Sequence, residues 1–188
     1  MEGICDPILL GHPDRIEAVK EELGLTFDCE IIDVRYDPRR RGDYADELHK
    51  LRGRKGLTRR DAINQLKSPN YFGPMMVHCG DADGYLGGIA HNYPDIVKPC
   101  LQTIGPDPSS HRIVGLYMMT VNGQLMFIAD ATINIYPDAR TLAEIAIQTA
   151  KVARRFGVSP KVAMLSFSNF GTSNELRTDR IEEAIAMA

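Results

Sequence analysis

The first part of the chain alternates between apolar runs and an amphipathic stretch. The apolar residues 8–10 predict a short buried strand, and residues 12–25 follow with apolar side chains at helical spacing until Gly24 ends the pattern. A second apolar run at 28–34 predicts another strand. A strand, a helix and a strand in this order indicate an α/β fold in which a crossover helix joins two parallel strands.

The middle of the chain predicts two helices, then a strand, then a third helix. We expect these elements at 44–56, at 58–68 with Thr58 as the cap, at 72–84, where the strand breaks into a tight turn, and at 93–105, where Pro99 interrupts the helix.

The second half of the chain begins with a different pattern. Two apolar runs within residues 112–134 flank Asn122-Gly123, which is the strongest short signal for a β-hairpin. An antiparallel pair of strands is therefore expected inside an otherwise alternating chain.

The clearest helical pattern of the chain covers residues 138–157. Thr141 and Glu144 have the spacing of a capping box, and Gly157 can supply a left-handed cap. We expect the apolar residues from 161 onward to form the next strand, and residues 180–188 to form a closing helix.

Composition and charge exclude several classes of protein. The 188 residues are 44% hydrophobic and 25% charged, which is typical of a globular protein with one domain or two small lobes. The net charge of −3 argues against a dedicated nucleic-acid binder, and no apolar run is long enough to span a membrane. Without a recognisable leader or CxxC pairing, the four cysteines favour a reduced, cytoplasmic protein. The five histidines lack metal-ligand spacing, which makes a zinc site unexpected.

A loop rich in hydroxyls and amides follows the apolar residues 162–165. Backbone N–H groups and small polar residues between a strand and a helix can bind an anion, but they equally suit an ordinary turn. The candidate ligand-binding residues of this loop are Ser166, Ser168, Asn169, Gly171, Thr172, Ser173 and Asn174.

The stretch from Arg35 to Arg60 carries ten basic and four acidic residues in a chain that is acidic overall. Arginine binds phosphate oxygens in a fork, so such a stretch can hold a phosphorylated small ligand. The alternative is a solvated helical face. The candidate ligand-binding residues here are Arg52, Arg54 and Lys55.

Two further polar groups follow apolar runs. Asp81 and Asp83, with Gly84 behind them, can bind a cation or orient a nucleophile, or they can simply be turn residues. Asp130 and Asn134 are more simply explained as capping the next element. The methionines at 75, 76, 118, 119, 126 and 164 lie in apolar runs and are expected to fill the core.

Several of these segments, taken together and in order, closely resemble the phosphate acetyltransferase/butyryltransferase family. They are "PILLG", "LHKLRGRKGLT", "YFGPMMVHCGDADGYLGG", "FIADATINIYPDARTLAEIA" and "RRFGVSPKVAMLSFSNFGTSN". The resemblance covers nearly the whole chain. The loop "SFSNFGTSN" and the segment "NYPDIVKPCLQTIG" look more like the C-terminal domain of bacterial NADP-dependent malic enzymes.

The resemblance implies a two-lobed, three-layer α/β/α fold like that of isocitrate and isopropylmalate dehydrogenases, incomplete at both ends here. The expected parts are a first lobe at 1–90 and a second lobe at 91–188 that contains the hairpin. It also implies a homodimer or higher homo-oligomer, and acyl transfer between coenzyme A and phosphate without a bound metal or cofactor. NADP and a divalent metal would belong only to the malic-enzyme part that this chain lacks.

The resemblance assigns individual residues unevenly. Arg52 matches the arginine of the family's Leu-Arg-x-x-Lys-Gly motif, which binds ligand in the acetyltransferases. Lys98 takes the place of an arginine before Pro-x-Leu-Gln, which keeps the charge but loses the bidentate fork. The family's catalytic Ser-Arg pair and aspartate lie in a segment beyond Ala188, so no catalytic residue is named here and the fragment alone is expected to be inactive.

Three hypotheses follow from the sequence. The first is an acetyl-CoA-sensing domain that regulates a malic enzyme, the second a stand-alone phosphate acetyltransferase, and the third a non-catalytic dimerisation lobe. Under the first two hypotheses, the ligands lie between the basic stretch and the hydroxyl-rich loop. These ligands are acetyl-CoA or CoA, and phosphate.

Overall fold

The computed structural model describes residues 3–108, 110, 112–165 and 176–188. The chain divides into two compact units, Met1–Gly105 and Pro106–Ala188, each of which is described here by itself. The hydroxyl-rich loop at 166–174, with its seven candidate residues, lies outside the described residues.

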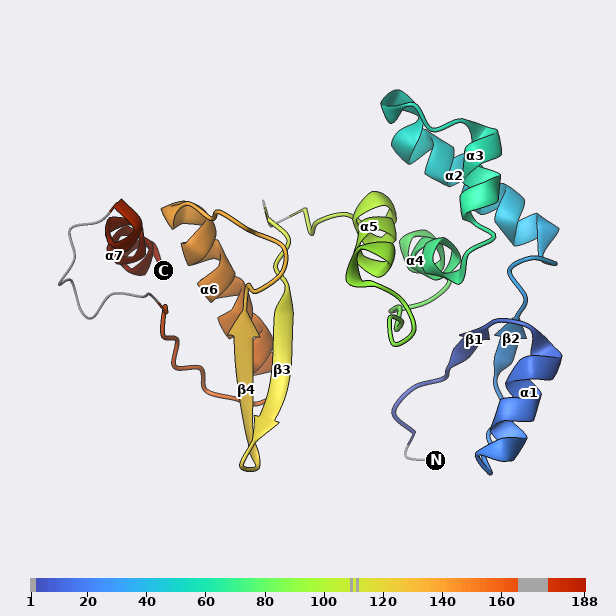
Figure 1. Ribbon diagram of the computed structural model, residues 1–188, viewed down its shortest axis with the longest axis horizontal. Helices are drawn as coiled ribbons and strands as arrows, with labels where there is room; N and C mark the ends of the chain where they lie inside the picture. The colour runs from blue at the N-terminus through green and yellow to red at the C-terminus, as the bar shows by residue number, and fades with distance from the viewer. Residues whose placement is uncertain (1–2, 109, 111, 166–175) are drawn as a thin grey trace. The chain divides into compact units, whose positions relative to one another are not determined.

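Unit 1 begins with the expected parallel pair of strands. Strands β1 (Ile8–Leu10) and β2 (Glu30–Ile32) lie side by side, and helix α1 (Pro13–Glu22) connects them (Figure 1). The Gly11 N–H donates to the Ile32 carbonyl at 2.9 Å and extends the pairing beyond β1. The predicted β-α-β unit is therefore confirmed.

Two of the predicted helices follow, with bounds that differ slightly from those expected. Helix α2 (Pro38–Arg52) begins earlier, because the Asp37 side chain accepts a hydrogen bond from the Arg40 N–H and caps it. A short 3₁₀ turn η1 (Gly53–Lys55) ends at Gly56, whose φ of 90° suits glycine. Helix α3 (Arg59–Gln65) is capped by Thr58, as predicted.

The predicted strand at 72–84 is wrong, because this segment belongs to helix α4 (Pro69–Cys79). Ser68 caps the helix by accepting from the Asn70 N–H at 3.3 Å, and Gly80 ends it with φ 82°. Phe72, Met75 and Met76 recur at helical spacing and are buried. The unbroken apolar run favoured a strand in the sequence, but tertiary packing selects the helix.

Helix α5 (Tyr93–Thr103) runs through Pro99 without the predicted interruption. The Thr103 hydroxyl donates to the Pro99 carbonyl at 2.9 Å, and α5 packs against α4. The core of unit 1 lies between the strands and helices α2, α3 and α4. Its fully buried side chains include Leu48, Leu66, Phe72 and Met75.

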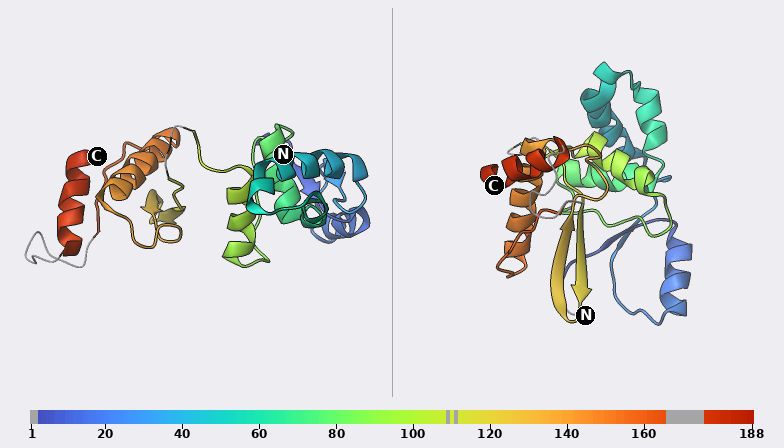
Figure 2. Two further views of the ribbon diagram at one scale, coloured as in Figure 1. Left: turned by 90° about the horizontal axis from the view of Figure 1, so that it is seen from above. Right: turned by 60° about the vertical axis from the view of Figure 1, so that its left-hand side comes forward.

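Unit 2 contains the predicted hairpin of β3 (Leu116–Val121) and β4 (Gln124–Ala129). Asn122 and Gly123 have φ values of 51° and 77°, as the expected turn requires. The hairpin is a long ribbon whose turn extends past the neighbouring helix of its unit (Figures 1 and 2). Its methionines do not fill a core as predicted: Met118, Met119 and Met126 are each more than two-fifths exposed.

The hairpin leads through a polar turn into two packed helices, α6 (Ala139–Arg155) and α7 (Leu176–Met187), which lie side by side (Figure 2). Asp138, rather than the predicted Thr141 and Glu144 pair, caps α6 by accepting from the Thr141 N–H at 2.8 Å. The predicted cap at Gly157 is confirmed by its φ of 73°. Residues 161–165 form no strand, which corrects the expectation for this segment.

The structure therefore mixes helices with two small sheets, one parallel and one antiparallel, and the α/β class is confirmed. Helix α5 packs against α4 and so belongs to unit 1. The boundary between the two units therefore lies after Gly105. The lobes at 1–90 and 91–188 and their dehydrogenase-like arrangement stay predictions. Within the described residues, no helix is both long and apolar enough to cross a membrane.

Candidate functional site

The basic stretch separates into side chains with partners and side chains without them. Arg40 donates to Glu30 at 2.9 Å, Lys50 donates to Glu47 at 2.8 Å, and Arg59 is bonded to Asp46. Arg41 donates to the carbonyls of Val34 and Arg35 at 3.2 and 2.7 Å. Arg40, Arg41 and Arg59 tie α2 to neighbouring segments, and Lys50 pairs within α2, so these cations have structural roles.

The predicted ligand-binding cations belong to the other half. Arg52 is the last residue of α2, and Arg54 and Lys55 lie in η1 directly after it. No carboxylate among the described residues pairs with any of the three. Cations at a helix C-terminus also interact favourably with the helix dipole, which is the structural alternative. Free guanidinium and ammonium groups within four residues nevertheless leave a concentrated positive charge for an anion.

Arg52 acts electrostatically on Tyr71 of α4, which is hydrogen-bonded to α5. The Tyr71 hydroxyl of α4 donates to the Gln102 side-chain oxygen of α5 at 2.8 Å. Burial raises the pKa of the Tyr71 phenol, and the Arg52 guanidinium partly opposes this rise. Lys98 lies one helical turn before Gln102, on the same face of α5, and is exposed. The structure thus groups Arg52 and Lys98 around Tyr71 and Gln102.

The aspartates of "GDADG" follow a helix, not a strand as predicted. Gly80 caps α4, and Asp81 comes directly after it. A helix C-terminus carries partial negative charge, so this position does not favour a phosphate. The Asp81 carboxylate accepts a hydrogen bond from the buried Tyr44 of α2. Burial, followed by this bond, raises the pKa of the Tyr44 phenol.

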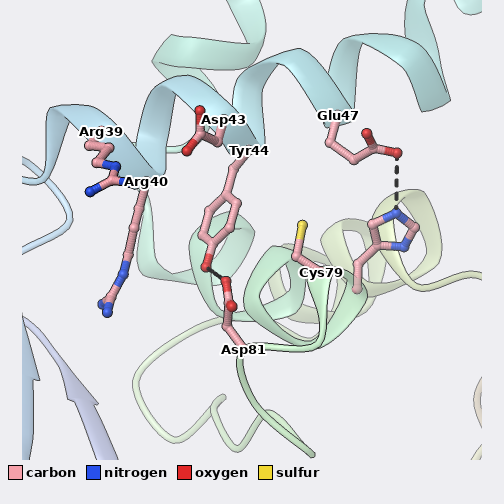
Figure 3. Close-up of a pocket in the computed structure, with 8 residues that line it drawn as sticks. Arg39, Arg40, Asp43, Tyr44, Glu47, Cys79 and Asp81 are labelled. Atoms are coloured by element: carbon pink, nitrogen blue, oxygen red, sulfur yellow. Dashed lines mark hydrogen bonds and ion pairs between the residues drawn. The ribbon is translucent and has the colours of Figure 1, made fainter.

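Asp81 also lines a cavity of about 650 Å³ between α2 and the end of α4 (Figure 3). Glu47 and His78 both line it, with 3.8 Å between the Glu47 Oε1 and His78 Nε2 atoms. Asp83 and Gly84 do not line this cavity, and their role in ligand binding stays a prediction. Sequence reasoning missed the remaining lining residues: Arg39, Arg40, Asp43, Tyr44, Glu47, His78 and Cys79.

The sequence could have indicated some of these residues. Tyr44 and Glu47 are three positions apart on a helix that was predicted. His78 and Cys79 were missed because their segment was assigned to a strand. Tyr71 and Gln102 carry no local signal, since they meet only when α4 packs on α5.

The polar pair after the hairpin has a structural role, as expected. The Asp130 carboxylate accepts from the N–H groups of Thr132, Ile133 and Asn134 at 2.9 to 3.0 Å. The Asn134 amide also donates to the Ile113 carbonyl at 2.9 Å. Burial raises the pKa of Asp130, but these donors outweigh it and the pKa lies below its usual range. Both oxygens of the Asp130 carboxylate are used within the fold.

Comparison with known proteins adds the context that geometry alone lacks. The sequence pattern of the family described as "Phosphate acetyl/butaryl transferase" matches residues 1–188. A phosphate acetyltransferase of Corynebacterium glutamicum is 36% identical over 188 residues, which are 100% of this chain and 57% of the relative. A probable NADP-dependent malic enzyme of Rickettsia prowazekii is 35% identical over 188 residues, covering 98% of this chain and 24% of the relative.

A solved structure extends the similarity to the fold. A phosphotransacetylase from Streptococcus pyogenes superposes with a TM-score of 0.88 at 35% identity, over 100% of this chain and 57% of that one. The chain thus spans a little over half the length of the Corynebacterium and Streptococcus proteins.

Proposed function

Since this chain belongs to the phosphate acetyl/butaryl transferase family, we propose that it forms the CoA- and phosphate-binding part of a phosphate acetyltransferase. The observation that carries the proposal is the match over residues 1–188. Most of the curated relatives compared are named phosphate acetyltransferases, so the comparisons favour this reading over the malic-enzyme domain that the loop "SFSNFGTSN" suggested.

In the reaction, the CoA thiolate attacks the acetyl carbonyl of acetyl phosphate, the carbon–oxygen bond to phosphate breaks, and acetyl-CoA and inorganic phosphate form. Both substrates carry phosphate groups, so the protein must hold several negative charges close together. Arg52, Arg54 and Lys55, which have no carboxylate partner among the described residues, suit this task. Holding two reactants in a fixed geometry can itself lower the barrier greatly.

The proposal is tested by assaying the full-length protein for acetyl-CoA formation from CoA and acetyl phosphate. Calorimetric titration of acetyl-CoA into wild type and Arg52→Ala measures the binding contribution of the guanidinium. Loss of a charged hydrogen bond should weaken binding by at least about 1.5 kcal/mol. Arg52→Lys should restore only part of the lost affinity for acetyl-CoA, since lysine lacks the bidentate fork of arginine.

Arg59→Ala is the matched control, because Arg59 lies in the same basic stretch but is bonded to Asp46. It should bind acetyl-CoA as wild type does. Equal affinities for wild type and Arg52→Ala would remove Arg52 from the site. Absence of both turnover and binding in the wild type would refute the proposed function.

A regulatory domain of an NADP-dependent malic enzyme is the second candidate, and the Rickettsia relative supports it. On that reading, the full-length protein would decarboxylate malate with NADP, and acetyl-CoA would change the rate without being consumed. Measuring malate-dependent NADPH formation separates the two candidates. A dimerisation lobe without ligand would show neither activity nor binding.

A further inference from the structure

The hydrogen bond between Tyr71 and Gln102 determines which way the Gln102 amide points. Its oxygen accepts from the Tyr71 hydroxyl at 2.8 Å, so the opposite side of the amide is its NH₂ group. No other described residue accepts from that group. The NH₂ group belongs to a side chain that is only half-buried, and its two donors are available to a ligand.

The positive charge of Arg52 agrees with the role of Tyr71 as the donor to Gln102. A tyrosine hydroxyl can either donate to an amide oxygen or accept from an amide NH₂. The guanidinium lies close enough to the phenol to influence its pKa. A cation that lowers the pKa of a phenol makes its hydroxyl a better donor, and here the hydroxyl donates to the Gln102 oxygen.

The Gln102 donors share a face of α5 with Lys98, one turn earlier. Helices α2, α4 and α5 pack together, which puts Arg52 in the same neighbourhood. An ammonium, a guanidinium and an amide NH₂ are all donors without an acceptor atom on the same group. Such a set suits a tetrahedral oxyanion with several acceptor oxygens.

We propose that Gln102 binds a phosphate group of the substrate through its side-chain NH₂, and that Tyr71 is a positioning residue that fixes the orientation of this amide. This inference rests on the proposed function, since it names two further residues of the same site. The phosphate can belong to CoA or to acetyl phosphate, and the experiment distinguishes the two. A purely structural pair, by contrast, would only tie α4 to α5.

Gln102→Glu separates these roles in the full-length enzyme. Glutamate has nearly the shape of glutamine and can still accept from the Tyr71 hydroxyl, so the connection between α4 and α5 survives. The NH₂ donors are replaced by a negative charge that repels phosphate. We expect KM for CoA or for acetyl phosphate, each measured with the other saturating, to rise by more than about tenfold. The substrate whose KM rises identifies the phosphate.

Tyr71→Phe should raise the same KM about three- to tenfold, as expected for one lost hydrogen bond, with kcat within about twofold of wild type. Because Tyr71 acts only through Gln102, adding Tyr71→Phe to Gln102→Leu should not raise this KM further. Tyr85→Phe is the matched control. The Tyr85 hydroxyl also donates to an amide oxygen, that of Asn70 at 3.0 Å, so its loss should lower thermal stability similarly and leave KM unchanged.

If Gln102→Glu turns over normally and has the same KM values as wild type, the inference is overturned. The proposed function would remain intact. Equal KM increases in Tyr71→Phe and Tyr85→Phe would also overturn it, because they would show a general loss of packing. An inactive wild type that does not bind acetyl-CoA would refute both the inference and the proposed function.

Discussion

The two units of the chain differ in how they bury their apolar side chains. In unit 1 the core side chains of α2, α3 and α4, such as Leu48, Leu66 and Phe72, are fully buried. In unit 2 the buried cluster consists of the small residues Ala139, Ala143 and Ala184, between α6 and α7. Unit 1 thus contains a core of large side chains, whereas unit 2 relies on close contact between helices.

The hairpin accounts for most of this difference. Phe127 packs against Phe156, with 5.8 Å between the ring centroids, on the side of the ribbon that faces α6. The opposite side carries the cross-strand pairs Tyr117–Ile128 and Met119–Met126, whose members are 40 to 48% exposed. Apolar side chains exposed together mark an interaction surface more often than a solvated one. Unit 2 therefore has an apolar face that its described residues leave uncovered.

The first prediction has the largest expected effect. It tests whether the core of large side chains in unit 1 contributes more to the free energy of unfolding than the hairpin of unit 2. Phe72→Ala removes a fully buried ring in unit 1 and should lower the free energy of unfolding by about 3–5 kcal/mol. Phe127→Ala removes a half-buried ring in unit 2 and should cost less than about 2 kcal/mol. Urea unfolding of both variants measures the difference. Equal losses would show that the hairpin packs as tightly as the core.

The second prediction concerns the uncovered face of the hairpin. We propose that it lies at the interface of a homodimer, as the family resemblance implied. Met119→Asp should then raise the dimer dissociation constant at least about thirtyfold, because a charge would be buried without a partner. Sedimentation equilibrium of the full-length protein measures this.

Val19→Asp is the matched control for Met119→Asp. Val19 lies on α1 in unit 1 and is 45% exposed, close to the 44% of Met119. The control should leave the dimer intact. A wild type that is monomeric at high micromolar concentration would remove the hairpin from any interface.

The third prediction uses the acid sensitivity of the turn after the hairpin. The pKa of Asp130 is lowered in the fold, so its stabilising effect is present above the unfolded value of about 3.9 and is lost as pH falls through the folded value. Asp130→Asn should lose about 1.5 kcal/mol at pH 7, since charged hydrogen bonds are replaced by neutral ones.

The difference between wild type and Asp130→Asn should shrink as pH falls below the unfolded value of about 3.9 and through the lowered folded value, because the wild-type carboxylate becomes protonated. The midpoints of urea unfolding of both proteins, recorded at several pH values, measure this difference in stability. A difference that does not change with pH would mean that the Asp130 charge contributes nothing to the turn.

The smallest expected effect compares helix caps in the two units. Thr58→Ala removes the cap of α3 and should cost about 1 kcal/mol. Glu144→Ala should cost less than about 0.5 kcal/mol, because Glu144 is not part of the cap of α6 and is only paired with Arg140. Thermal unfolding of the two variants measures both. A larger loss for Glu144→Ala would restore the capping box that the sequence suggested.

The elements that the sequence predicted correctly are those with short-range signals. Asn122-Gly123 specifies a hairpin because both residues tolerate positive φ, and Thr58 specifies a helix start because its hydroxyl accepts a backbone N–H nearby. The β-α-β unit at the start of unit 1 was likewise visible in its alternating pattern. Each of these signals acts within a few residues, so no knowledge of packing is needed.

The sequence also determined, through the order of its motifs, the family. Tertiary structure alone decided the type of one element and the contacts between residues distant in the chain. Residues 69–79 form a helix because Phe72, Met75 and Met76 are buried together, a fact that an unbroken apolar run does not reveal. Tyr71 and Gln102 are 31 positions apart and meet only when α4 packs on α5. Contacts between residues so distant in the chain depend on the closure of long loops, and no local pattern records which loops close.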